Sequence, residues 1–185
     1  MCDSLRGQYL IAGKQLRDRN FFKTVILIVE HGEDGAMGLV VNRAFEALSF
    51  PELLSQLGIE GGSSRQDFLI HTGGPVEMGR GFVLHSSDFV RDGTMVVDND
   101  VALTASVEIL RAIADGAGPR RSLLALGYSG WGPGQLEREI RANGWLHAPA
   151  DEDLVFSEDI DGKWQRAVAK IGVDWSKLSS EAGHA

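Results

Sequence analysis

Four glycines lie within the eight residues from Gly127 to Gly134, in the stretch LGYSGWGPGQLEREI (126–140). Glycine-rich segments of this kind bind phosphates in nucleotide-binding proteins and expose a nucleophilic serine in hydrolases. An apolar run (122–126) precedes the glycines, and a helix-like run (135–143) follows them. The sequence therefore predicts a strand, a loop and a helix, and leaves three alternatives for the loop: a phosphate site, a nucleophile elbow or a tight turn.

The spacing argues against a phosphate site. A Walker-type loop ends in Gly-Lys followed by Ser or Thr, because the lysine and the hydroxyl contact the phosphates and the magnesium ion. Here Gly134 is followed by Gln135, and no glycine completes the dinucleotide-binding fingerprint. Glu137 and Glu139 lie in the first turns of the predicted helix, where their charge repels a phosphate. A nucleotide polyphosphate is therefore not the expected ligand.

A nucleophile elbow is also disfavoured. The elbow reads G-x-S-x-G, whereas Ser129 is followed by a glycine and then by Trp131, which is too bulky for the sharp turn. In the tight-turn alternative, Pro133 starts the helix and the Gln135 amide reaches back to an unsatisfied N–H group. Tyr128 and Trp131 then cover apolar surface, or form the wall of a small-molecule cleft.

Three of the five histidines, His31, His71 and His85, end predicted strands. A histidine acts as a general base near neutral pH when a carboxylate orients it. A hydrolase or transferase that uses His31 or His85, oriented by Glu30 or Asp18, is therefore an alternative. No H-x-x-x-H or H-E-x-x-H spacing occurs, so neither a metal site nor a cofactor is expected.

The elements that must position these residues follow from hydrophobic periodicity and from Gly and Pro punctuation. Strands are predicted at 8–12, 24–31, 37–43, 67–71, 81–86, 94–98 and 122–127, with 72–80 as an interruption and 58–66 as a loop. Helices are predicted from the N-cap Ser49 to Gly58, and over 101–115, 133–142 and 163–171, with an extended segment at 145–149. This order indicates an α+β fold in a single domain spanning 1–185, with flexible ends at 1–5 and 176–185.

Charge and composition restrict the class of partner. The formal net charge is −8, which disfavours direct binding to nucleic-acid phosphates, because that mode depends on clustered Lys and Arg. The single cysteine, Cys2, allows no internal disulfide and fits a reducing compartment. No run reaches the roughly 18 apolar residues of a membrane span. A cytoplasmic protein without membrane attachment is expected.

Taken together, the motifs resemble those of the bacterial YqgE/AlgH family. The resemblance runs from about Leu5 to the end of the chain. It rests on LIA (10–12), D-x-N-F (18–21), EH (30–31), GAMGLVVN (35–42), GGPV (73–76), GFVLH (81–85), LTAS (103–106), GYSGWGPGQLE (127–137) and AGHA (182–185). Ser129 stands where the family motif commonly has alanine, which argues further against a nucleophile at this position.

The resemblance implies a mixed α/β domain with an extended sheet curled toward a barrel, helices packed against it, and a groove bordered by the motif residues. It also implies a role in transcriptional regulation, and it brings no established catalytic activity or cofactor with it. We expect an indirect regulator whose groove binds a small molecule or a protein partner. A direct DNA-binding regulator is a further alternative. The candidate groove residues are His31, Asn42, Gly73, Gly74, His85, Tyr128, Trp131 and Gln135.

Overall fold

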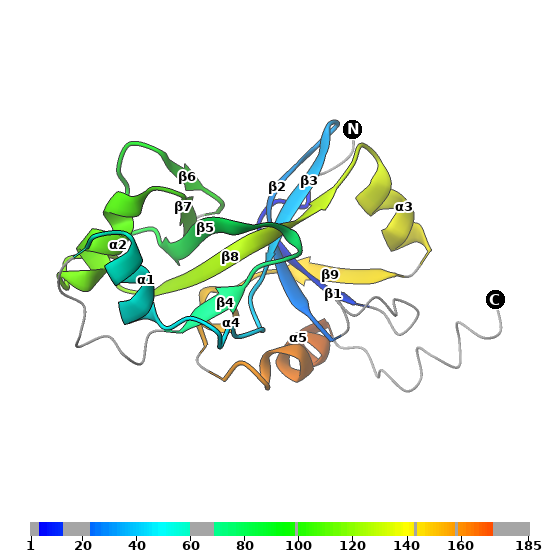
Figure 1. The fold of residues 1–185 in the computed structure, drawn as a ribbon. Helices are drawn as coiled ribbons and strands as arrows, with labels where there is room; N and C mark the ends of the chain where they lie inside the picture. The colour runs from blue at the N-terminus through cyan, green and yellow to red at the C-terminus, as the bar shows by residue number, and fades with distance from the viewer. Residues whose placement is uncertain are drawn as a thin grey trace.

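The computed structural model describes residues 4–12, 23–59, 69–98, 100–142, 144–157 and 159–171. Within these residues the chain forms one nine-stranded sheet and five helices (Figure 1). The strands are β1 (Gln8–Ala12), β2 (Val25–Gly32), β3 (Gly35–Val40), β4 (Ile70–Thr72), β5 (Val76–Ser86), β6 (Thr94–Val96), β7 (Val101–Thr104), β8 (Ser122–Trp131) and β9 (Trp145–Pro149). The helices are α1 (Phe50–Gln56), α2 (Val107–Ala114), α3 (Gln135–Arg141), α4 (Glu152–Phe156) and α5 (Lys163–Ile171).

The long strand β8 joins the two halves of the sheet. The strand order is β6-β7-β5-β8-β3-β2-β1-β9, and β4 pairs with β8 outside this order. The first part of β8 pairs with β5 and, in parallel, with β4, whereas its last three residues pair antiparallel with β3. The sheet is a curled, largely antiparallel half-barrel with helices packed against it, so the expected α+β fold is confirmed.

Strand β2 is buried on both faces, as its nearly continuous apolar sequence predicts. Val25, Leu27 and Val29 point to a core that also contains residues of α4 and α5, whereas Ile26 and Ile28 point to a core formed with α3 and β9. A third core packs α1 and α2 against β4, β5 and β8. The sheet therefore separates α5 from α3, which lie on its opposite faces (Figure 1).

Helix α1 begins as the sequence predicts. The Ser49 hydroxyl accepts a hydrogen bond from the Glu52 backbone N–H, and the Glu52 carboxylate accepts one from the Ser49 N–H. This capping box satisfies two N–H groups that the helix leaves unpaired. The helix at 163–171 is also found as predicted, and the 145–149 segment is strand β9.

Three predicted elements were wrong in their bounds. The helix predicted at 101–115 is strand β7 followed by α2, because 101–104 are buried between β5 and β6. The interruption predicted at 72–80 ends early, since β5 already begins at Val76. The glycine-rich segment after Leu126 continues β8 through Trp131, and α3 begins at Gln135 rather than near Pro133. The short helix α4 was not predicted.

Some sequence predictions lie outside the described residues. These are most of the loop at 58–66, residues 1–3 and 176–185 of the ends expected to be flexible, and Asp18. Within the described part of the chain, no helix has the length and apolar character needed to cross a membrane.

Candidate functional site

His31, at the end of β2, is held by hydrogen bonds at both ring nitrogens. Its Nδ1 accepts the backbone N–H of Leu5 (2.8 Å), so its proton lies on Nε2, which faces the carboxylate of Glu137 on α3. The bond from His31 lowers the pKa of the Glu137 carboxyl below its usual range. The carboxylate partner is thus Glu137 and not Glu30. Because the Nδ1 lone pair is already used, His31 has no free site to act as a general base.

The start of α3 carries two more of the predicted residues. The Gln135 side chain accepts the backbone N–H of Gly132 (2.9 Å), which is the reach-back contact that the sequence predicts, made from the first helical position. Trp131 is buried against Trp145, with ring centroids 5.9 Å apart in an edge-to-face arrangement. His31, Trp131 and Gln135 therefore share one end of the molecule, around α3.

Gly73 and Gly74 lie against β8 and not against α3. The Gly73 carbonyl accepts hydrogen bonds from the Val40 N–H (2.9 Å) and from the buried hydroxyl of Ser129 (3.3 Å). A Cβ atom on Gly74 would come within 2.3 Å of the Tyr128 carbonyl oxygen. The Tyr128 ring packs edge-to-face on Phe82, 5.9 Å away. The glycines thus let the β4–β5 connection approach β8 closely.

Asn42 and His85 each make their own hydrogen bonds. Asn42 follows β3; its Oδ1 accepts the Val25 N–H (2.8 Å) and its Nδ2 donates to the Lys23 carbonyl (3.0 Å). His85 is fully buried on β5. Its Nδ1 donates to the Ser86 carbonyl (2.9 Å), so Nε2 accepts from the Thr104 hydroxyl (2.8 Å). Burial also lowers the pKa of His85, so its ring is neutral and both nitrogens are occupied.

A cavity of about 650 Å³ lies elsewhere, between the α2–β8 connection and the segment that joins α4 to α5. We call it the basic cavity, because its described lining includes two arginines and a histidine and no Asp or Glu. This composition stands out in a chain of net charge −8. The lining residues are Leu69, His71, Ile113, Gly116, Gly118, Pro119, Arg120, Arg121, Ser122, Leu123, Phe156, Ser157 and Ile160.

His71, on β4, is the buried polar group of this cavity. Its side chain is buried, and Nδ1 makes no hydrogen bond to the described residues. Burial, reinforced by the positive charge of Lys163, lowers its pKa to about 4; the carbonyl groups of Leu124 and Leu69 act in the opposite direction. Buried polar atoms almost always have partners, so the unpartnered Nδ1 sets His71 apart from the other buried polar groups of this region.

Lys163, at the start of α5, is fully buried next to this site. Its Nζ donates to the carbonyl oxygens of Val41 and Val155, both at 2.7 Å. Burial, together with the positive charges of Arg166 and Arg121, lowers its pKa to about 7. Lys163 therefore links α5 to the end of β3 and to α4. In its protonated form it also places a positive charge near His71.

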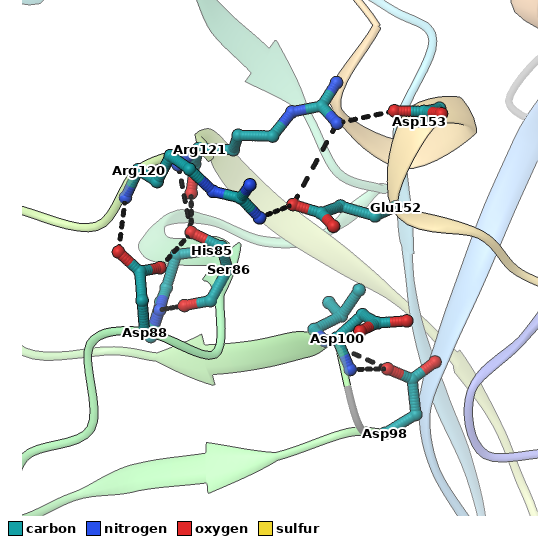
Figure 2. Close-up of polar contacts among 10 residues, drawn as sticks. His85, Ser86, Asp88, Asp98, Asp100, Arg120, Arg121, Glu152 and Asp153 are labelled. Atoms are coloured by element: carbon teal, nitrogen blue, oxygen red, sulfur yellow. Dashed lines mark hydrogen bonds and ion pairs between the residues drawn. The ribbon is translucent and has the colours of Figure 1, made fainter.

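Arg120 and Arg121 form the charged rim of the basic cavity, and Figure 2 shows both reaching toward α4. Arg120 donates to the carboxylate of Glu152 (2.6 Å), and Arg121 donates to that of Asp153 (2.8 Å). The arginine side chains are 68% and 30% exposed, and that of Asp153 is 82% exposed. Solvent weakens the more exposed of these pairs, so the Arg120 guanidinium can exchange partners at lower cost than that of Arg121, which also lies over the Phe156 ring.

The backbone of this rim is fixed more firmly than its side chains. The Arg120 N–H donates to the Asp88 carboxylate (2.9 Å), and the Arg121 N–H donates to the Ser86 hydroxyl (3.0 Å), as Figure 2 shows. Ser86 in turn donates to Asp88, and this bond lowers the pKa of the Asp88 carboxyl. The backbone of the rim is therefore held by β5 and the segment that follows it, and its side chains are held by α4.

A second cavity, of about 990 Å³, adjoins the basic cavity and shares Leu69 and Ile160 with it. Its charged lining residues are Arg43, Glu46, Glu52, Asp159 and Asp161, and Asn42 also lines it. Its carboxylates give it the opposite charge character to the basic cavity. Among the described residues, no cluster of three or more His, Cys, Asp or Glu side chains could hold a metal ion.

Sequence reasoning did not single out the residues of the basic cavity as a site. His71 was noted at a strand end, but Arg120, Arg121 and Lys163 were not considered, because a turn and a helix start are ordinary places for basic residues. The signal that could have found them is the pair of adjacent arginines after Gly118 and Pro119 in an acidic chain. His31, Tyr128, Trp131 and Gln135 line neither of the two large cavities.

Comparison with known proteins places the chain in a family. The family model described as AlgH-like (DUF179) matches residues 9–176. A UPF0301 protein of Afipia carboxidovorans is 52% identical over 98% of this chain and 90% of its own length, and one of Rhizobium meliloti is 50% identical over 98% and 93%.

Two solved structures resemble this fold. The solution structure of the AlgH protein from Pseudomonas aeruginosa has a TM-score of 0.80 at 42% identity and covers 100% of this chain and 98% of its own. A crystal structure of a Corynebacterium diphtheriae protein has a TM-score of 0.73 at 20% identity over 91% and 88%, which shows a shared fold. The chain therefore belongs to the AlgH-like family.

Proposed function

We propose that this protein is a non-enzymatic, ligand-responsive regulator that binds a small molecule in the basic cavity and acts on transcription indirectly. The single observation that carries the proposal is the basic cavity itself, whose described lining combines two arginines with a buried histidine that has an unpartnered ring nitrogen. A volume of about 650 Å³ falls within the range of small-molecule sites. A cavity wall of apolar side chains with few polar groups is typical of such sites.

The attachment of α4 and α5 supports a regulatory role. Phe156 and Ser157, which follow α4, line the cavity, and Glu152 and Asp153 on α4 pair with its arginine rim. A ligand that recruits Arg120 and Arg121 competes directly with the pairs that hold α4. Occupancy of the cavity is thereby coupled to the surface that α4 and α5 present, which is how one site influences a distant one.

The catalytic alternative receives little support from the geometry. Both ring nitrogens of His31 and of His85 are engaged, and Ser129 is buried with its hydroxyl bonded to Gly73. The remaining buried histidine, His71, has its pKa lowered to about 4, which makes it a weak base near neutral pH. The direct DNA-binding alternative is disfavoured by the net charge of −8 and because these basic groups surround a recess.

A thermal-shift screen tests the proposal. The purified protein is screened against sugar phosphates, nucleotides, organic acids, sugars and short peptides. A ligand at a hundredfold excess over its dissociation constant stabilises the native state by roughly 2.7 kcal/mol, which raises the melting temperature by about 5–10 °C. We expect at least one such ligand.

Two variants locate the bound ligand. Ser122→Phe fills the basic cavity from its β8 wall, and Gln135→Ala removes the side chain predicted from sequence to border a groove near α3. We expect the ligand-induced shift to vanish in Ser122→Phe and to persist in Gln135→Ala, with the melting temperature of each free variant as the control for folding. The opposite pattern would contradict the proposal and move the site to the surroundings of His31 and Gln135.

A further inference from the structure

The charge of the basic cavity indicates what kind of ligand it takes. Its described lining residues include two arginines, one histidine and two serines, with no Asp or Glu among them. Lys163 lies fully buried behind His71 and adds positive potential. Guanidinium groups bind carboxylate and phosphate oxygens in a forked geometry, and a recess with low-dielectric walls strengthens that attraction.

The partners of the two arginines already mimic such a ligand. Glu152 and Asp153 offer a carboxylate to Arg120 and Arg121 from α4, outside the described lining of the cavity. Exposed ion pairs of this kind contribute little to stability, so an anion in the cavity can displace them at small cost. The apolar lining from Ile113, Leu123, Phe156 and Ile160 then accommodates an apolar body attached to the anionic group.

The state of His71 adds a condition to binding. The neutral ring has one proton and one lone pair, and Nδ1 has no hydrogen-bond partner among the described residues. Nδ1 is buried, so an anion in the cavity acts on the ring through its charge rather than through a bond to this atom. A negative charge nearby favours the protonated imidazole.

Resting on the proposed function, we propose that the ligand of the basic cavity carries a phosphate or carboxylate group, and that His71 takes up one proton from solvent when this anion binds. Burial, and after it the positive charge of Lys163 on α5, keeps His71 neutral in the empty cavity, while Arg121 and Arg166 act on Lys163. The negative charge of the anion opposes both effects and allows the imidazole to protonate.

Isothermal titration calorimetry with benzoate as the probe tests this inference. Benzoate has an apolar ring and a carboxylate that stays ionised from pH 6 to pH 8; phenyl phosphate serves as the phosphate probe at fixed pH, and benzyl alcohol as the uncharged control. We expect both anions to bind and benzyl alcohol not to bind. Titrations in two buffers of different ionisation enthalpy should show net proton uptake with benzoate.

The dissociation constant of benzoate should depend on pH in a defined direction. Uptake of one proton per ligand tightens binding by up to tenfold for each unit that the pH falls, so the dissociation constant of benzoate should decrease from pH 8 to pH 6. In His71→Gln, proton uptake and pH dependence should both decrease, and what remains is the contribution of Lys163, whose pKa is about 7. His147→Gln is the matched control, because His147 is exposed on β9, and it should behave like the wild type.

The arginine rim provides a second comparison. Arg120→Gln should weaken benzoate binding by about tenfold, whereas Arg138→Gln, an exposed arginine on α3, should leave it unchanged. If benzoate binds with the same affinity at pH 6 and pH 8 and without proton uptake, the inference is wrong and the proposed function stands. If the cavity binds neutral or cationic probes in preference to anions, the inference is likewise wrong and the proposed function stands. If no probe occupies the cavity in wild type, the inference fails, and the proposed function fails with it only if the thermal-shift screen also finds no ligand.

Discussion

Gly74→Ala is expected to destabilise the protein by about 3 kcal/mol or more, because the added Cβ has no room. It would lie 2.2 Å from the carbonyl carbon of Tyr128, 2.3 Å from its oxygen and 2.5 Å from the backbone nitrogen of Ser129. These are backbone atoms of β8, which pairs with β3, β4 and β5 and cannot move without disturbing all three. The connection from β4 to β5 would have to leave the sheet.

Gly79→Ala is the matched control for this variant. Gly79 lies on β5, is exposed, and has no atom within 4 Å of its added Cβ. Its substitution should change the free energy of unfolding by less than about 1 kcal/mol. Urea denaturation followed by circular dichroism measures both variants. Equal denaturation midpoints for Gly74→Ala and Gly79→Ala would contradict the close packing of the β4–β5 connection on β8.

Lys163→Met is expected to cost about 3 kcal/mol at pH 7, since it leaves the carbonyl oxygens of Val41 and Val155 buried without their donor. The substitution also changes how stability depends on pH. The pKa of Lys163 falls from 10.5 in the unfolded chain to about 7 in the folded protein. Between these values the unfolded chain binds more protons, so the free energy of unfolding of the wild type rises with pH.

For this one group, the slope of the free energy of unfolding against pH is at most about 1.4 kcal/mol per pH unit. The neutral amine keeps two N–H groups, enough for the two carbonyl acceptors, so deprotonation of Lys163 retains both bonds. The scan runs from pH 7 to pH 9, because burial raises the pKa of Tyr9 to about 12 and its deprotonation lowers stability at higher pH. We expect Lys163→Met to lose this slope.

Lys170→Met, in the same helix, is the control. Lys170 is partly exposed and pairs with Asp151, so its loss should leave the pH slope of the wild type in place. Urea denaturation at each pH gives the free energies. A wild type whose stability is flat between pH 7 and pH 9, or a Lys163→Met variant that keeps the slope, would contradict the burial of a titrating amine at this position.

The sequence predicts best the elements whose periodicity arises from burial. Helix α5 is found over the predicted residues, and β2 shows the continuous burial expected of a strand covered on both faces. The errors arise where tertiary pairing overrides a local pattern. Residues 101–104 fit the periodicity of the helix that follows, yet they pair with two strands. Gly127 and Gly130 belong to a strand because the backbone of the β4–β5 connection packs against Gly127 and Gly130 pairs with Met37 on β3.

The candidate site was less predictable than the fold. His31 finds its carboxylate 106 residues away, on α3, because β8 pairs with β3 and brings α3 to the end of the β2–β3 hairpin. The basic cavity combines β4, the α2–β8 connection and the segment after α4. No local spacing links His71, Arg121 and Lys163, so only the packing of the elements shows that their charges act together.

The measurement that tests the basic cavity most directly is a titration of the ¹⁵N-labelled protein with benzoate, followed by ¹H–¹⁵N correlation NMR. The account predicts chemical-shift changes for the amides of His71, Arg120, Arg121, Ser122 and Ser157, with the Glu152 and Asp153 amides responding as the arginines change partners. Changes centred instead on His31 and Gln135, or spread without relation to the cavity, would contradict it.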